Sequence, residues 1–79
     1  MDKIYVITFA DGFKRTMGIH NTKTSKNELS LADILIRIVD EGTYSLDDIV
    51  MIQLIKEEDL PSHYIKVIFK GAFNDYYRV

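Results

Sequence analysis

Hydrophobic positions between Ser30 and Gly42 recur with the spacing of an amphipathic helix. At about 100° per residue the polar residues fall opposite an apolar arc, widened by Ile36, that consists of Leu31, Ala32, Ile34, Leu35, Ile38 and Val39. Ser30 and Asp33 have the spacing of a capping pair, and Gly42 suits the left-handed residue after a helix. A helix of three turns is unstable alone in water, so we expect it to pack on a sheet.

A first hairpin is predicted before this helix. Residues 3–10 and 13–20 are strand-like and flank Asp11-Gly12, a dipeptide that favours a two-residue turn. The resulting register turns one face toward the helix, consisting of Ile4, Val6, Thr8, Ala10, Phe13, Arg15, Met17 and Ile19. The other face then carries Tyr5, Ile7 and Phe9. A one-residue slip would instead send these three residues into the core.

Two strands are predicted after the helix. Residues 64–70 alternate apolar and polar positions, as a half-exposed strand does, whereas residues 49–56 are apolar on both faces. The second pattern is typical of a strand in the middle of a sheet. We expect the two strands to form a hairpin around residues 57–63. Asn74-Asp75 then suits a turn before a short last strand at residues 76–79, with irregular chain as the alternative for this end.

These elements predict one α+β domain over residues 1–79. The arrangement is hairpin–helix–hairpin (ββαββ), with one helix packed on a four- or five-stranded, mainly antiparallel sheet. If the third strand lies beside the first, the sheet is fully antiparallel and residues 49–56 are central. If the fourth strand lies there instead, it runs parallel to the first in a β-grasp-like sheet. We favour the first order, because an edge strand as apolar as residues 49–56 would promote aggregation.

Composition and motifs exclude several classes of function. The chain has no cysteine, which excludes disulfides, thiolate catalysis and cysteine-based metal sites. No apolar run approaches the roughly 18 residues that span a bilayer, and we expect a cytoplasmic protein. Phosphate-loop and nucleophile-elbow motifs are absent, and neither His20 nor His63 has a second ligand at metal-binding spacing. We therefore expect no catalytic residues, no metal and no cofactor.

Charge is distributed unevenly along the chain, whose net charge is −2. Residues 28–59 contain nine acidic and two basic side chains, while residues 1–26 contain five basic and two acidic ones. Segregation of this kind steers partners more than it stabilises a fold. By analogy of size and charge with phage inhibitors, the acidic block suits docking on a basic surface such as the nucleic-acid channel of an enzyme.

The functional hypothesis is a small non-enzymatic protein–protein interaction module. It fits a phage or mobile-element protein that binds and inhibits or regulates a host nucleic-acid-handling complex. A single helix also leaves one apolar sheet face for a partner, for a second copy in a homodimer, or for the C-terminal aromatic residues. The candidate partner-binding residues are Asp40, Glu41, Asp47, Asp48, Glu57, Glu58, Asp59, Tyr5, Phe9, Tyr76 and Tyr77.

The alternative hypothesis is a small nucleic-acid-binding regulator that uses the basic first hairpin and loop, residues 14–26. Cationic side chains would contact phosphates, and aromatic rings would stack on bases. The candidate cations are Lys14, Arg15, Lys23 and Lys26, and the candidate rings are Tyr5 and Phe9. A pI near 5.5 argues against this alternative.

Overall fold

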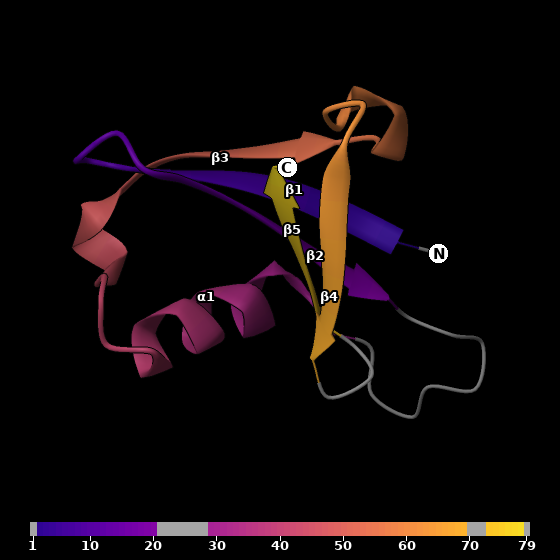
Figure 1. Ribbon diagram of the computed structural model, residues 1–79. Coiled ribbons are helices and arrows are strands. Elements are labelled where there is room, and N and C mark those ends of the chain that lie inside the picture. The colour runs from indigo at the N-terminus through magenta and orange to yellow at the C-terminus, as the bar shows by residue number, and fades with distance from the viewer. Residues whose placement is uncertain (1, 21–28, 70–72, 79) are drawn as a thin grey trace.

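The computed structural model describes residues 2–20, 29–69 and 73–78 (Figure 1). These residues form an α+β fold with five antiparallel strands in one open sheet and one helix. In chain order the elements are β1 (Asp2–Phe9), β2 (Lys14–His20), α1 (Leu31–Asp40), η1 (Leu46–Asp48), β3 (Ile49–Ile55), η2 (Glu57–Asp59), β4 (Tyr64–Phe69) and β5 (Phe73–Arg78), where η1 and η2 are single 3-10 turns.

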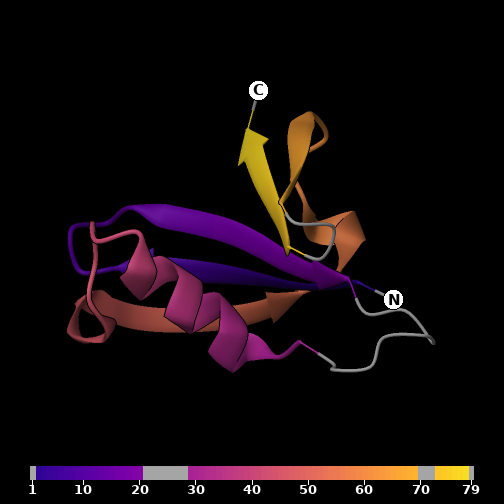
Figure 2. The same cartoon turned by 90° about the horizontal axis from the view of Figure 1, so that it is seen from below.

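The sheet has the strand order β3-β1-β2-β5-β4. Its strands do not lie in one plane. In Figures 1 and 2, β1, β2 and β3 run alongside α1, while β4 and β5 cross their direction steeply and β5 remains paired with β2. Strand twist of one hand accumulates across a sheet and accounts for this rotation.

The helix prediction is confirmed. Helix α1 begins after Ser30, whose N–H donates to the carboxylate of Asp33 at 2.6 Å. It ends before Gly42, which has a φ of 81°. Ile34 and Ile38 are buried, so this part of the predicted apolar arc faces the sheet, whereas Ala32, Ile36 and Val39 are exposed.

The first hairpin differs from the predicted register by one residue. Phe9 donates its N–H to the carbonyl of Phe13 at 2.8 Å, and Gly12 donates to the carbonyl of Phe9 at 2.8 Å. The loop therefore contains three residues, Ala10 to Gly12, and Gly12 takes the left-handed conformation with a φ of 89°. A three-residue loop that ends in a left-handed glycine uses the same dipeptide as the predicted two-residue turn. The predicted pairing of Ala10 with Phe13 is wrong.

This shift reverses the two faces of β1. Tyr5, Ile7 and Phe9 lie beneath the helix and not on an open face, so the predicted bare surface of these residues is wrong. The main core consists of buried side chains from β1, β2 and α1, namely Ile7, Phe9, Met17, Ile19, Ile34 and Ile38.

A second, smaller core lies on the other side of the sheet. Ile4 packs there with Leu60 and Tyr76, although Ile4 was predicted to face the helix. Gly18 allows the close approach of Tyr76, because a Cβ at this position would lie 3.0 Å from the tyrosine ring. The second face of the sheet is therefore covered in part by the segment after β3 and by β5.

The position of β3 corrects the predicted strand order. β3 does pair with β1, as the favoured order requires, but it lies at the edge and not in the centre. β4 pairs with β5 instead of β3, so the predicted second hairpin is wrong. β5 begins at Phe73, which places the predicted turn residues Asn74 and Asp75 inside a strand. The β-grasp-like order is also excluded, because each pairing is antiparallel.

The ten residues of α1 are too few to cross a bilayer. None of the helices in the described part of the chain has the length and apolar character that a membrane span requires.

Candidate protein-binding surface

One long side of β3 is unpaired. The strand Ile49–Ile55 pairs with β1, and none of the described strands lies along its other side. The direction of its backbone groups follows from the neighbouring hairpin. Phe9 donates its N–H to β2, so Val6, three residues earlier, directs its N–H and C=O toward β3. Val6 pairs with Gln53, and the residues beside Gln53, Ile52 and Leu54, consequently direct their N–H and C=O groups away from the sheet.

The side chains of this free edge are apolar and exposed. Val50 is 62% exposed and Leu54 65%, while Met51 and Ile52 are 44% and 36% exposed. Ile52 and Leu54 lie on the helix side of the sheet, because their partners in β1 belong to the main core or pack against it. No residue of β3 is charged. We call the strand Ile49–Ile55 with these outward groups the β3 edge.

Both ends of the β3 edge are held by capped 3-10 turns. Ser45 donates its N–H to Asp48 at 2.8 Å before the strand, and Lys56 donates its N–H to Asp59 at 3.0 Å after it. A carboxylate that accepts the first N–H of a turn fixes the direction in which the chain enters it. The edge is therefore an extended strand of defined length between two turns.

The predicted acidic residues do not form one patch. Asp40 and Glu41 lie at the end of α1, and Asp47 and Asp48 lie in the following turn, η1. The other three, Glu57, Glu58 and Asp59, lie in η2. Figure 1 shows η1 and η2 at opposite ends of β3, which spans about 20 Å. Asp48 and Asp59 cap turns, and Glu41 binds Arg15, so these three support the fold itself.

The predicted aromatic residues are mostly inaccessible. Phe9 is 1% exposed and Tyr76 is 8% exposed, so neither can meet a partner in this structure. Tyr5 is partly buried against the main core. Tyr77 is the exception, with 49% of its surface exposed.

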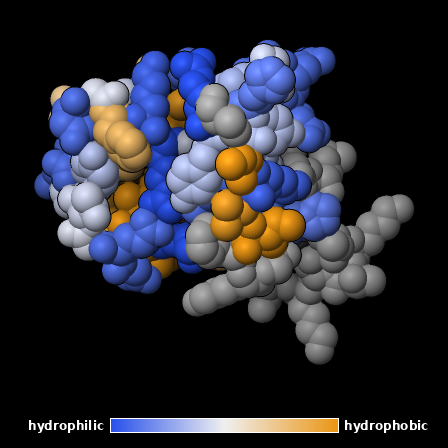
Figure 3. Space-filling view, viewed as in Figure 1, coloured by the Kyte–Doolittle hydropathy of each residue, from blue (hydrophilic) through white to orange (hydrophobic). Residues whose placement is uncertain are grey.

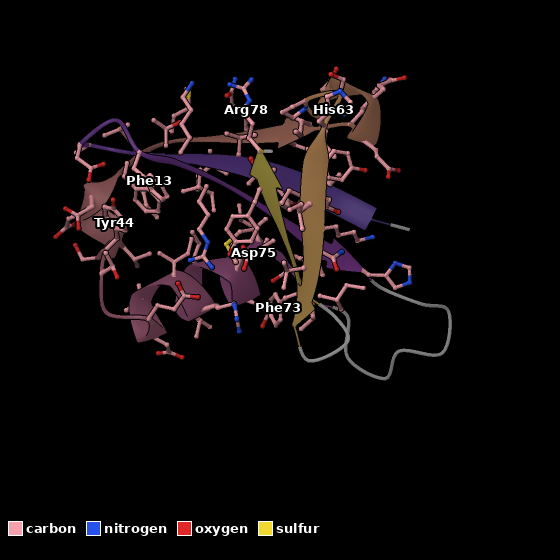
Figure 4. All side chains as sticks on the ribbon, in the orientation of Figure 1. Phe13, Tyr44, His63, Phe73, Asp75 and Arg78 are labelled. Carbon is pink, nitrogen blue, oxygen red and sulfur yellow. The ribbon has the colours of Figure 1, made fainter. Side chains whose placement is uncertain are left out.

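An ion-pair cluster missed by the sequence analysis joins β2, β5 and the end of α1. Arg15 donates from Nε and Nη2 to the two carboxylate oxygens of Asp75, at 3.2 and 3.1 Å, and also binds the carboxylate of Glu41. Figure 4 shows Asp75 directed into the interior above α1. Hydrogen bonds from Arg15 lower the pKa of Glu41, and the bond to Glu41 raises the pKa of Arg15. These contacts hold β5 against β2 and the end of α1, and we call the cluster of Arg15, Glu41 and Asp75 the clamp. No signal in the sequence distinguishes Asp75 from a turn residue.

A stack of aromatic rings attaches the segment before η1 to the first hairpin. The rings of Phe9 and Tyr44 lie 3.9 Å apart between centroids, and Phe13 stacks beside them (Figure 4). Tyr44 donates its hydroxyl to Asp11 at 2.8 Å. Hydrogen bonds from the N–H of Phe13 and from Tyr44 lower the pKa of Asp11. These contacts fix the start of β3 relative to β1.

The basic residues of the alternative hypothesis are only partly placed. Lys23 and Lys26 lie outside the described residues. Lys14 lines a groove of about 680 Å³ between the first hairpin, η2 and the β4–β5 hairpin, together with Tyr64, Tyr77 and Arg78. Arg15 lines it too but is committed to Glu41 and Asp75.

Metal-binding groups are not assembled in the part of the chain that the structure describes. There, no three side chains of the ligand types His, Asp and Glu are placed to hold an ion. His63 lies beside η2 (Figure 4), and His20 ends β2 at an exposed position.

Comparisons with known proteins add no relative. No protein-family model matches the chain, and no curated protein or solved structure shows significant similarity to it.

Proposed function

We propose that the protein is a small non-enzymatic interaction module that binds another protein along the β3 edge. One observation carries the proposal: the edge is uncharged and exposes four apolar side chains, Val50, Met51, Ile52 and Leu54. Strand addition obtains affinity from backbone hydrogen bonds and specificity from alternating side chains. Ile52 and Leu54 supply both, because their backbone groups and their side chains are available together.

Charge at the two ends of the edge favours a basic partner. Asp47 in η1 and Glu57 and Glu58 in η2 are exposed and flank the uncharged strand. Acidic groups around an apolar contact raise the association rate with a positively charged surface more than they raise affinity. We therefore propose a partner with a basic surface, such as a complex that handles nucleic acid. Binding would inhibit or regulate that complex, a role that suits a phage or mobile-element protein acting on its host.

The test introduces the same positive charge in place of an exposed aliphatic side chain at each of the two sheet edges. Leu54→Lys places a charge on the β3 edge, and Ile65→Lys is the matched control in β4, where Ile65 is 55% exposed. Tagged proteins capture partners from a bacterial lysate, and mass spectrometry identifies them. We expect Leu54→Lys to lose partners that the wild type and Ile65→Lys retain. Equal capture by Leu54→Lys, with unchanged circular dichroism, would contradict the proposal.

A second candidate function is nucleic-acid binding in the groove beside Lys14. The observation that favours it is the shared lining of Lys14, Arg78, Tyr64 and Tyr77, because cations and aromatic rings together suit single strands. Asp59 and Asp75 also line the groove and weaken its positive potential, so we rank this function second.

Fluorescence anisotropy with single-stranded oligonucleotides at low salt decides between the candidates. If the groove binds nucleic acid, Lys14→Glu and Arg78→Glu should each weaken binding and reduce its salt dependence. Leu54→Lys should leave that binding unchanged. Binding that is absent in the wild type removes the second candidate.

A further inference from the structure

We infer that the β3 edge binds a short extended segment of a partner protein, about five residues long, with apolar side chains turned toward α1 and basic residues at both ends. The inference rests on the proposed function, in which this edge is the binding element. The length, the side-chain pattern and the charge of that segment each follow from a different feature of the edge.

The backbone of the edge sets the length of the segment. Ile52 and Leu54 direct their N–H and C=O groups away from the sheet, which offers four groups to a partner. After the strand, Lys56 donates its N–H to the carboxylate of Asp59 at 3.0 Å, and its C=O accepts from the N–H of Asp59 at 2.9 Å. Before Ile52, the register with β1 shifts and leaves Val50 without a partner in β1, which interrupts the outward alternation. Regular strand hydrogen bonds are therefore available opposite Ile52 and Leu54, and a segment of about five residues satisfies them.

Helix α1 forms a second wall beside this edge. Leu35 and Arg37 lie on opposite flanks of the helix, each about 80° from the centre of its buried stripe. The guanidinium of Arg37 lies 5.6 Å from the centre of the Phe73 ring in β5. Since β1 and β2 separate β5 from β3 in the sheet, the other flank, with the half-buried Leu35, faces β3. Figure 2 shows α1 running obliquely across the strands with its N-terminal end toward β3.

The two faces of a bound segment meet different surroundings. Residues directly opposite Ile52 and Leu54 place their side chains on the helix side, because paired residues share a face of the sheet. There they meet the exposed side chains of Ile52 and Leu54 and the flank of α1 that carries Leu35. The residue between them lies on the other face, where its neighbour is the exposed Gln53. The segment therefore needs apolar residues at two alternate positions and a polar residue between them.

Charge determines the ends of the segment. The turn η1 contains two carboxylates, and Lys56 with η2 contains one ammonium group and three carboxylates, so each end of β3 carries a net charge of −2. Lysine or arginine on either side of the apolar positions is attracted to these ends, which raises the association rate. A second copy of the edge would instead bring its own acidic turns there, and like charges across strands are unfavourable. The edge thus fits a basic segment of another protein.

A phage-display library of short random peptides tests this pattern. The library is selected on immobilised wild-type protein and counter-selected on Leu54→Lys, whose fold is checked by circular dichroism. We expect the enriched peptides to carry apolar residues at two alternate positions with Lys or Arg outside them, and to bind Ile65→Lys as they bind the wild type. Enrichment of acidic peptides or of peptides without the alternation would overturn the inference, as would no enrichment at all.

Fluorescence anisotropy with one enriched peptide tests the wall formed by α1. Leu35→Ala removes apolar contact and should weaken binding about tenfold. Ile36→Ala is the matched control, because Ile36 is 59% exposed on the side of α1 away from the sheet, and it should leave binding unchanged. Serine at either apolar position of the peptide should also weaken binding, whereas serine between them should not. Equal affinities in both comparisons would overturn the placement of the apolar side chains against α1.

The peptide selection and the lysate capture separate this inference from the proposed function. Suppose that Leu54→Lys loses its lysate partners but the library yields no peptide. The proposed function then stands, and binding of a short segment is overturned. If an enriched peptide binds the wild type but not Leu54→Lys, while both proteins capture the same lysate partners, the peptide site stands and the proposed function is overturned.

Discussion

The two edges of the sheet, β3 and β4, differ in how they avoid unwanted pairing. β4 exposes Ile65 and Ile68, and Figure 3 shows apolar surface over this strand, but Lys66 stands between them. β3 exposes more apolar surface and has no charge along its length. Lysine on an edge strand is a common protection against edge-to-edge association. The difference is consistent with the proposal that β4 is protected and that β3 binds a partner.

The largest expected effect removes the support that both edges share. Ile38 lies in the main core beneath the sheet, so Ile38→Ala should lower the free energy of unfolding by about 3–5 kcal/mol through lost burial and a cavity. The matched control is Ile36→Ala, because Ile36 is 59% exposed on the same helix and should change stability by under about 0.5 kcal/mol. Urea denaturation measures both. Equal losses would mean that the helix is buried on both faces.

A variant with a somewhat smaller expected effect acts on the β4 side of the sheet more than on the β3 side. Arg15→Met leaves the carboxylate of Asp75 buried without its bidentate partner, which should cost about 3 kcal/mol. The clamp holds β5 and, through it, β4. Hydrogen exchange should therefore become faster in β4 and β5 than in β1 and β3. Adding Asp75→Asn should recover part of the loss, and uniform exchange across the sheet would show that the clamp is not local.

A moderate effect concerns pH. Arg15 lowers the pKa of Glu41 below its ordinary value of 4.5 in the folded protein. Glu41 therefore contributes stability above about pH 4.5, and this contribution is lost as the pH falls through the lower folded pKa. Glu41→Gln should be less stable than the wild type at pH 7 and lose less on acidification, with Asp11 supplying part of the remaining loss. Parallel stability curves for the two proteins between pH 7 and pH 3 would contradict this expectation.

The variant with the smallest expected effect on stability, Lys66→Ile, tests the difference between the two edges most directly. Lys66→Ile should change the free energy of unfolding by under about 1 kcal/mol, yet it removes the charge that protects β4. We expect this variant to form assemblies larger than the wild type as concentration rises in sedimentation velocity. Ile52→Lys adds a charge to β3 and leaves Lys66 in place, so this reciprocal control should form no such assemblies. If Lys66→Ile sediments as the wild type does, the lysine is not the protecting group.

Local signals predicted the helix and its ends but not the hairpin register. Ser30 and Asp33 act on each other at the start of the helix, and Gly42 acts on the turn directly before it, so their effects can be inferred from spacing alone. Asp11-Gly12 suits both a two-residue and a three-residue loop, and these differ by one residue in register. The choice depends on which face of β1 meets the helix, which is a contact between distant residues.

The β3 edge was the least predictable part of the candidate site. An apolar strand pattern shows that both faces avoid polar groups, but it is the same for a central strand and for an edge that binds a partner. The strand that pairs with β2 on its other side is β5, and its Asp75 binds Arg15, which lies sixty residues earlier in the sequence. That pairing is invisible in the local pattern, where Asn74-Asp75 indicates a turn. The acidic residues were found by composition, and their division between the two ends of β3 follows from their places before and after the predicted strand.

The insertion of β5 between β2 and β4 has a consequence for synthesis on the ribosome. β1, β2, α1 and β3 can assemble as soon as they emerge, because β1 pairs with β2 and β3 and the buried side chains of the main core come from β1, β2 and α1. β4 emerges next, but its partner in the sheet is β5, which is made after it. During synthesis, the apolar strand β4 is therefore exposed until its partner β5 has been made. This interval is the point in the life of the protein at which a ribosome-associated chaperone would have most to bind.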